Sequence, residues 1–217
     1  MKALLIIGLQ NSYLNKSEFD IKKLNLILQS AIRVLEYFRM NRLPVFHIKS
    51  EYSENEDLFI ENISELLPLE NEIVIEKKEF NSFNQTNLDA KLQEFGVDDL
   101  VICGMMTDLT IDATVRCAKD LKYNVTLISD ACIARDLEFK GIKFPGVLVN
   151  NVFLAVLENG YAKVISSRDY VDSQDETIEN PDANDTLENE KEDVVTIEEL
   201  QDLESIDEEY VIYEYDE

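Results

Sequence analysis

The 217-residue sequence contains few of the residues on which several protein classes depend. Its three cysteines, Cys103, Cys117 and Cys132, are odd in number and too few for a disulfide framework. No stretch approaches the ~18 consecutive apolar residues of a membrane span. The N-terminus MKALLIIGLQNSYL has neither a signal-peptide n-region nor a small-residue cleavage site. Without an export signal, a reducing cytoplasm is the expected location.

Basic residues are also scarce. The chain has 20 Lys and Arg against 45 Asp and Glu, which gives a formal net charge of −25. Phosphate groups are bound by clustered Lys and Arg, so we expect neither nucleic acid nor a membrane surface as a partner. The apolar fraction of 45% excludes wholesale disorder, and a chain of this length can bury a sizeable core.

The charge is unevenly distributed. Residues 172–217 contain 20 acidic residues and one basic residue, Lys191, whereas residues 1–171 contain 25 acidic and 19 basic residues. This change predicts an α/β domain over 1–171, a solvated acidic linker over 172–193 and a short helix and strand over 194–217.

The segment 194–217 has features of a small docking element. Thr196 and Glu199 have the spacing of a capping box, and Ile197 and Leu200 share one face of the predicted helix. A helix this short is marginal by itself in water. Two interpretations stay open: a solubilising tail, or a segment that docks on its own core, a sister subunit or another protein.

Residues 1–171 alternate predicted strands and helices. The continuous apolar run 3–7 is typical of a strand buried on both faces of a parallel sheet, and the three-to-four spacing in 20–42 indicates an amphipathic helix. The predicted strands are 3–7, 45–48, 73–75, 100–103, 125–128 and 162–165, and the predicted helices are 20–42, 88–95, 109–121 and 146–159. This order predicts a doubly wound, mostly parallel sheet with helices on both faces. The ligand site of such a sheet lies at the strands' carboxyl ends, here after Ile7, Ile75 and Cys103.

Four segments resemble the isochorismatase-like cysteine hydrolases, a family that includes nicotinamidases. ALLIIGLQNSYL is similar to the family's opening strand, EKKEFNSF to its lysine segment, LVICGMMTDLTIDATVRCAKD to its nucleophile segment and SDACIA to the strand and turn that follow. The resemblance covers roughly residues 1–170. It implies catalysis by a cysteine thiolate at a helix N-terminus, a nearby lysine, a proton-carrying aspartate and backbone N–H groups that hold the oxyanion.

Two of the three catalytic side chains are replaced in this sequence. Gly8 stands at the position of the aspartate and Thr110 at that of the cysteine, whereas the lysine is retained as Lys77. Glycine cannot move a proton, and a threonine hydroxyl is a poor nucleophile without an adjacent base. We therefore interpret the chain as a pseudoenzyme that binds or scaffolds, with a pocket that could hold a small carboxylate. The pocket candidates are Gln10, Lys77, Phe83, Met105, Met106 and Thr110.

Two other interpretations stay open. One is a hydrolase of a small amide or enol ether with rearranged catalytic groups, for which Cys132 is the candidate nucleophile. The other is a purely structural subunit of an oligomer. Because relatives of this fold commonly self-associate, we expect a homo-oligomer, with the helix 109–121 as its interface. Asp108 is expected to cap this helix.

Nicotinamidase-type members hold a divalent ion through an aspartate and two histidines after the second strand. This chain has one histidine, His47, which we expect to be a hydrogen-bonded residue of the sheet. We therefore expect no metal and no cofactor. The family's nucleophile turn often contains a cis peptide that does not precede proline, which here would join Met105 to Met106.

Overall fold

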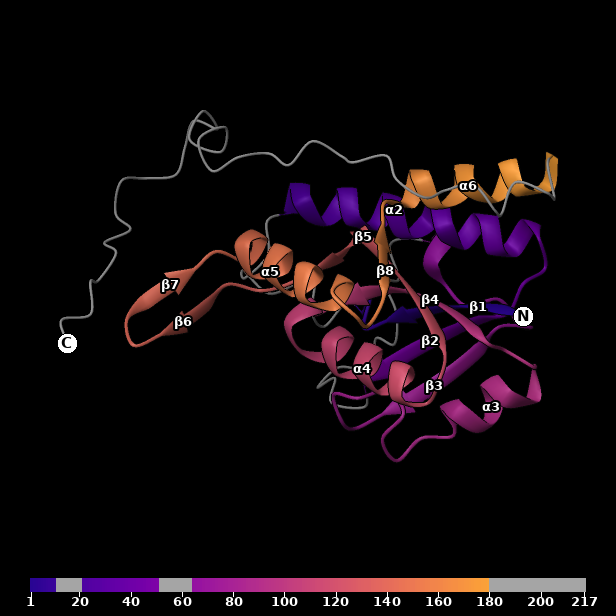
Figure 1. The fold of residues 1–217 in the computed structure, drawn as a ribbon, viewed down its shortest axis with the longest axis horizontal. Coiled ribbons are helices and arrows are strands. Elements are labelled where there is room, and N and C mark those ends of the chain that lie inside the picture. Colours follow the sequence, from indigo (N-terminus) through magenta and orange to yellow (C-terminus); the bar gives the residue numbers. More distant parts are fainter. Residues whose placement is uncertain (11–20, 51–63, 180–217) are drawn as a thin grey trace. The chain divides into compact units, whose positions relative to one another are not determined.

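The computed structural model of the chain describes residues 1–10, 21–50 and 64–179. Within them, six strands form one sheet in the order β3-β2-β1-β4-β5-β8, and every neighbouring pair is parallel (Figure 1). The strands are β1 (Lys2–Ile7), β2 (Val45–Ser50), β3 (Ile73–Lys77), β4 (Asp99–Met105), β5 (Asn124–Ile133) and β8 (Lys163–Ile165). This confirms the predicted doubly wound sheet. The chain reverses its winding direction between β1 and β4, where ligand sites of such sheets occur.

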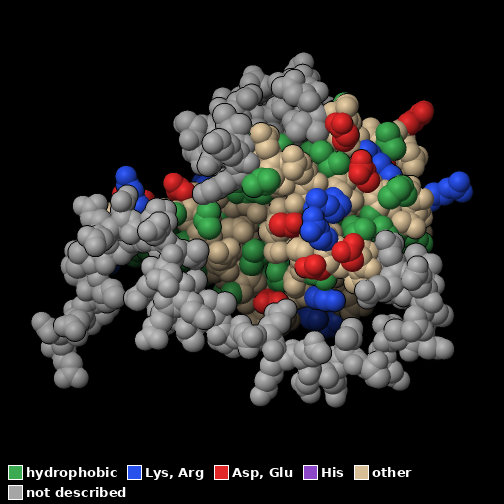
Figure 2. Space-filling view, turned by 90° about the horizontal axis from the view of Figure 1, so that it is seen from above, with side chains coloured by type: hydrophobic (Ala, Val, Ile, Leu, Met, Phe, Trp, Pro, Cys, Tyr) green, Lys and Arg blue, Asp and Glu red, His purple; other side chains and the backbone are tan. Residues whose placement is uncertain are grey.

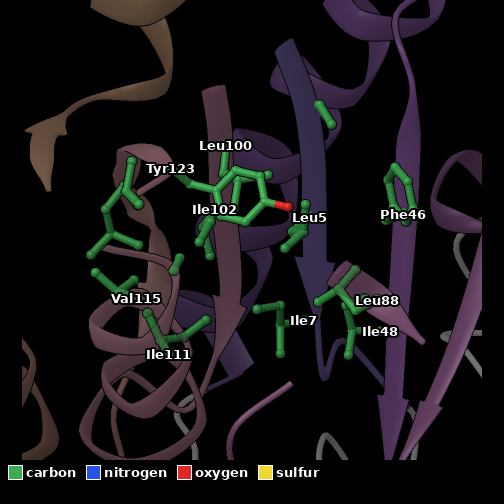
Figure 3. Close-up of a cluster of buried hydrophobic side chains, with 14 of the residues drawn as sticks. Leu5, Ile7, Phe46, Ile48, Leu88, Leu100, Ile102, Ile111, Val115 and Tyr123 are labelled. Atoms are coloured by element: carbon green, nitrogen blue, oxygen red, sulfur yellow. The ribbon is translucent and has the colours of Figure 1, made fainter. Parts of the chain in front are cut away.

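Helices cover both faces of the sheet. The helices α2 (Ile21–Met40) and α6 (Ser167–Glu179) lie on one face, and α3 (Leu88–Glu94), α4 (Asp112–Asp120) and α5 (Gly146–Glu158) lie on the other (Figure 1). The run in β1 is apolar throughout because its residues alternate between two cores. Leu4 packs with α2, whereas Leu5 and Ile7 pack beneath Ile111 and Val115 in the core that Figure 3 shows.

The predicted strands and helices are present, and the structure adds three elements. They are a 3-10 turn (Ser64–Leu66), a hairpin of β6 (Leu137–Phe139) and β7 (Ile142–Phe144), and the helix α6. The expected boundary at residue 171 falls inside α6, and the compact unit extends to Ile178. The helix was not predicted because its sequence is acidic and carries little apolar periodicity. In the structure the buried side chain of Tyr170 anchors it to the domain. Residues 180–193 and the expected docking segment 194–217 lie outside the described residues.

The strands β1 and β4 approach each other very closely at their carboxyl ends. Gly104 has a φ of +128°, and a Cβ at this position would overlap the carbonyl oxygen of Ile7. The ladder between β4 and β5 shifts register between Ile102 and Gly104. A glycine is therefore required at Gly104, and the turns that follow β1 and β4 are brought into contact.

No helix in the described part of the chain is long and apolar enough to cross a membrane. On the described part of the face in Figure 2, Lys and Arg side chains lie among Asp and Glu side chains and form no separate basic patch.

Candidate functional site

The loops after β1, β3 and β4 enclose a cavity of about 300 Å³ at the carboxyl ends of these strands. The three positions at which the resemblance implies catalytic side chains, Gly8, Lys77 and Thr110, all line it. Its other lining residues are Ser50, Lys78, Glu79, Phe80, Met105, Met106 and Leu109. Of the expected pocket residues, the structure brings together Lys77, Met105, Met106 and Thr110. Gln10 and Phe83 do not line the cavity.

The backbone at Gly8 leaves no room for a side chain. Gly8 has a φ of +69°, and a Cβ built on it would lie 2.6 Å from the carbonyl oxygen of Met105. The turn is held in place because the Gly8 N–H donates to the Ile48 carbonyl at 2.9 Å and Gly8 accepts from the Gln10 N–H at 2.8 Å. Any residue with a β-carbon would have to displace this turn or the one after β4.

Gln10 ties two loops together beside the cavity. Its Oε1 accepts a hydrogen bond from the Ser50 N–H at 2.7 Å, and its Nε2 donates to the Ser50 carbonyl at 3.3 Å. The side chain is buried between the end of β1 and the end of β2. Gln10 is therefore placed as a support of the cavity, and Ser50, which sequence reasoning missed, lines it instead.

Phe83 points into the core, where its ring stacks on Tyr123 with centroids 6.0 Å apart. The loop takes this direction because Ser82 is bound to α4. The Ser82 N–H donates to the Thr114 hydroxyl at 3.0 Å, and that hydroxyl donates to Ser82 Oγ at 2.9 Å. Phe80 lines the cavity in place of Phe83. Its position three residues after Lys77 was the only local signal that could have identified it.

Lys77 brings a buried cation to the cavity. The residue is 3% exposed, and its Nζ donates to the carbonyl oxygens of Glu79 at 2.9 Å and Phe80 at 3.4 Å. Burial lowers the pKa of the Lys77 ammonium to about 8, although the Glu79 carboxylate partly opposes this shift. Lys77 is thus held by backbone carbonyls of its own loop, in a position where its ammonium can meet a ligand.

Thr110 lies in a tight turn that begins the helical segment after β4. The peptide bond between Met105 and Met106 is cis, as the resemblance implied. A single π-turn, Thr107–Ile111, leads into α4, so the predicted helix 109–121 starts with a wider turn. The Thr107 hydroxyl donates to the Asn150 side-chain oxygen of α5 at 2.6 Å, which fixes the turn from the other side.

Asp108 does not cap this helix. No side chain of the described residues caps the π-turn, and the buried Asp108 carboxylate instead lies 3.5 Å from Nε of Arg135. The expectation of a capping role was wrong because a cation from the loop after β5 approaches the carboxylate. Because Arg135 lies far from Asp108 in the sequence, no local sequence pattern could predict this ion pair.

The cysteines are poorly placed for nucleophilic chemistry. Cys103 and Cys132 are buried in β4 and β5, and neither lines the cavity. Burial raises the pKa of the Cys132 thiol to about 12, with a further contribution from the Asp130 carboxylate, and raises that of Cys103 well above its ordinary value. Both thiols are therefore protonated at neutral pH. Cys117 is half-buried on α4.

The residues present do not fit the metal site of nicotinamidase-type members. His47 is fully buried in β2, and its Nε2 lies 2.7 Å from Oε2 of Glu72, as expected for a hydrogen-bonded residue of the sheet. The chain has no second histidine. Within residues 1–10, 21–50 and 64–179, no group of three or more His, Cys, Asp or Glu side chains could hold a metal ion.

The open parallel sheet, with a lysine-containing cavity at its carboxyl ends, has the architecture of a doubly wound α/β protein, and known proteins identify it further. A model of the isochorismatase domain matches residues 2–144. An uncharacterized isochorismatase family protein of Bacillus subtilis is 37% identical over 169 residues, which are 75% of this chain and 94% of that protein. The crystal structure of an isochorismatase from Pseudomonas putida has a TM-score of 0.72 at 32% identity, covering 77% of this chain and 89% of its own.

The chain belongs to the isochorismatase family. One relative from Arabidopsis thaliana is named a probable inactive nicotinamidase; it is 31% identical over 157 residues, which cover 61% of this chain and 80% of that protein.

Proposed function

We propose that this chain is a catalytically inactive member of the isochorismatase family that binds a small carboxylate at Lys77. The observation that carries the proposal is the backbone of Gly8, which closes against Met105 where the family's proton-carrying carboxylate is expected. With no carboxylate from position 8, the Lys77 ammonium is left to pair with an acid supplied by a ligand.

The cavity supports a small anionic ligand. Its volume of about 300 Å³ is at the lower end of the range for ligand pockets. The Lys77 ammonium has three N–H donors, of which two are directed at the carbonyls of Glu79 and Phe80. Within the described residues the third has no acceptor, so it can donate to a ligand oxygen. Met105, Met106 and other apolar side chains supply the walls, which favours a carboxylate attached to a small apolar body.

Hydrolysis lacks the groups it requires. At the position of the family's nucleophilic cysteine, Thr110 offers only a hydroxyl group. That hydroxyl would need a general base, but the position of the family's aspartate is occupied by Gly8, which has no side chain. The alternative nucleophile, Cys132, is buried with a raised pKa and is not part of the cavity. The existence of a relative that is named a probable inactive nicotinamidase supports the proposal of an inactive member.

Paired titrations test the proposal. Isothermal titration with benzoate and nicotinate, each beside its amide, measures whether the cavity selects the carboxylate. We expect the acids to bind at least about tenfold more tightly than the amides, and Lys77→Met to remove this preference. Equal affinities for acid and amide would contradict the binding role. Release of ammonia from the amides would instead support the hydrolase alternative, and a complete lack of binding would support a purely structural subunit.

A further inference from the structure

The two lysines that the structure describes as buried differ in their partners. Lys77 and Lys49 are 3% and 7% exposed. The Lys49 ammonium forms an ion pair with the Glu76 carboxylate at 2.5 Å. No carboxylate of the described residues forms such a pair with Lys77, whose Nζ donates to the carbonyl oxygens of Glu79 and Phe80. Because an anionic partner favours the charged form of a lysine, Lys77 is the buried lysine that can supply a neutral amine.

The turn after β1 explains why this partner is missing. The family's aspartate is expected at position 8, where a carboxylate would hold the lysine in its charged form. Gly8 supplies no carboxylate, and the space that a Cβ on it would need is occupied by the Met105 carbonyl oxygen. Burial then lowers the pKa of Lys77 to about 8, although the Glu79 carboxylate partly opposes the shift. Near this pH, about half of the molecules carry a neutral amine at the cavity.

The hydrogen bonds of Lys77 also orient this amine. A neutral amine has two N–H donors and one lone pair, which are arranged tetrahedrally with the side-chain carbon around the nitrogen. The two N–H groups have acceptors in the carbonyl oxygens of Glu79 at 2.9 Å and Phe80 at 3.4 Å. The lone pair then takes the remaining direction, which neither carbonyl oxygen can occupy. A desolvated amine with an unblocked lone pair at the wall of a cavity is a nucleophile.

We propose that Lys77 captures small aldehydes reversibly by forming an imine in the cavity. The amine nitrogen attacks the carbonyl carbon and a C–N bond forms, while the π electrons of the C=O bond move to the oxygen, which takes one proton from the nitrogen. The C–O bond of this carbinolamine then breaks. The oxygen leaves as water with the second proton of the nitrogen, and a C=N bond remains. No oxidant or reductant is needed, because no electrons are gained or lost overall. The inference uses the same cavity as the proposed function but does not require carboxylate binding.

The cavity favours an aldehyde with a compact apolar body. Its volume is about 300 Å³, and its lining includes four large apolar residues, Phe80, Met105, Met106 and Leu109. Apolar walls exclude water from a bound group, which slows the hydrolysis that would return the imine to amine and aldehyde. A ketone carries a second substituent on the carbonyl carbon and needs more room beside Lys77. Benzaldehyde, which has a flat apolar ring on an unhindered carbonyl, is therefore a suitable probe.

Reductive trapping on the full chain tests the proposal. Sodium cyanoborohydride converts an imine with benzaldehyde into a stable benzylamine, which peptide mass spectrometry locates. Near the pKa of Lys77, we expect Lys77 to be labelled at least about tenfold faster than Lys49 or Lys91. Lys49 is the control for burial because it is ion-paired, and Lys91 is the control for an exposed lysine. Lys77→Arg keeps a cation but has no nucleophilic amine, so it should abolish the fast labelling.

The decisive comparison is made within the wild-type chain, so a folding defect in a variant cannot obscure it. Labelling of Lys77 that is no faster than that of Lys91 would overturn the proposal. Competition with benzoate separates this inference from the proposed function. If benzoate binds at Lys77, it should slow the labelling of Lys77 and leave that of Lys91 unchanged. Fast labelling of Lys77 that saturating benzoate does not slow would support aldehyde capture and contradict the carboxylate site.

Discussion

Gly8 and Met105 meet at the mouth of the cavity, where the carbonyl oxygen of Met105 occupies the space that a β-carbon on Gly8 would need, 2.6 Å away. The two residues follow β1 and β4, which are neighbouring strands in the sheet. Because of this contact, a side chain at position 8 fits only if the backbone of the turn after β1 or of the turn after β4 moves. Restoring a carboxylate there would therefore require more than one substitution.

The first prediction separates the contact with Met105 from the cost of the backbone conformation. Gly8→Ala should destabilise the fold by about 3 kcal/mol, because it adds a steric clash to a left-handed φ. Gly96→Ala is the matched control. Gly96 has a similar φ of +62° with nothing within 4 Å of a Cβ, so about 1 kcal/mol is expected. Urea unfolding measures both, and equal losses would mean that the turns adjust freely around position 8.

The second prediction concerns the environment of Thr110. A thiol introduced by Thr110→Cys should be alkylated faster than the native Cys117, because the Lys77 ammonium and the helical segment favour the thiolate. Adding Lys77→Met should slow this reaction. Peptide mass spectrometry after brief iodoacetamide treatment locates the label, and the buried Cys103 and Cys132 should stay unlabelled in the folded chain. An inert thiol at position 110 would show that the cavity does not stabilise an anion.

The third prediction follows from the lowered pKa of Lys77. Burial of the ammonium costs free energy below pH 8, and this cost disappears as the pH rises from about 8 to 10.5, where the unfolded chain also loses its proton. Lys77→Met should therefore be more stable than wild type by about 2–3 kcal/mol at pH 7, with the difference vanishing at high pH. Lys91→Met, on the exposed side of α3, should change stability by less than about 0.5 kcal/mol. A Lys77→Met variant less stable than wild type at pH 7 would contradict this account.

The fourth prediction concerns Glu72, which joins α2 to β2. Burial alone would raise its pKa, but hydrogen bonds from Arg39, His47 and the Leu69 N–H outweigh this and lower the pKa to about 2. The ionised carboxylate therefore stabilises the fold above pH 4.5, and this stability is lost as the pH falls towards 2.

Glu72→Gln should cost about 3 kcal/mol at pH 7 and flatten the fall in stability with acid. Glu94→Gln, in an exposed pair with Lys91, is the control and should leave the acid profile unchanged. Thermal midpoints measured from neutral to acidic pH give both profiles. An acid profile of Glu72→Gln that is identical to wild type would exclude Glu72 as the titrating group.

The sequence was sufficient for elements whose signal is local. The apolar run of β1 and the helical spacing of α2 predicted both elements, and Lys77 was found from its spacing to Phe83. Side-chain direction in loops was not predictable from the same patterns. Whether Phe80 or Phe83 faces the cavity depends on the hydrogen bonds between Ser82 and a helix thirty residues away.

The missed features share this dependence on distant partners. Asp108 pairs with Arg135 across the fold, and α6 is held by contacts that its acidic sequence does not reveal. At the start of α6, the Ser167 N–H and hydroxyl both donate to the Asp130 carboxylate, at 2.7 Å each. Asp130, which belongs to the family-like segment SDACIA, thus anchors α6. From its acidic composition, the part of this helix after residue 171 was predicted to be a linker.

The central claim is that the chain retains a cavity at the family's active-site position but does not catalyse hydrolysis there. The most direct test follows product release from nicotinamide and isochorismate by the purified full chain, with the intact mass of the protein recorded during the incubation. The account predicts no product above the buffer control and no change in protein mass. Steady product release that Lys77→Met abolishes, or an acyl adduct on the polypeptide, would contradict it.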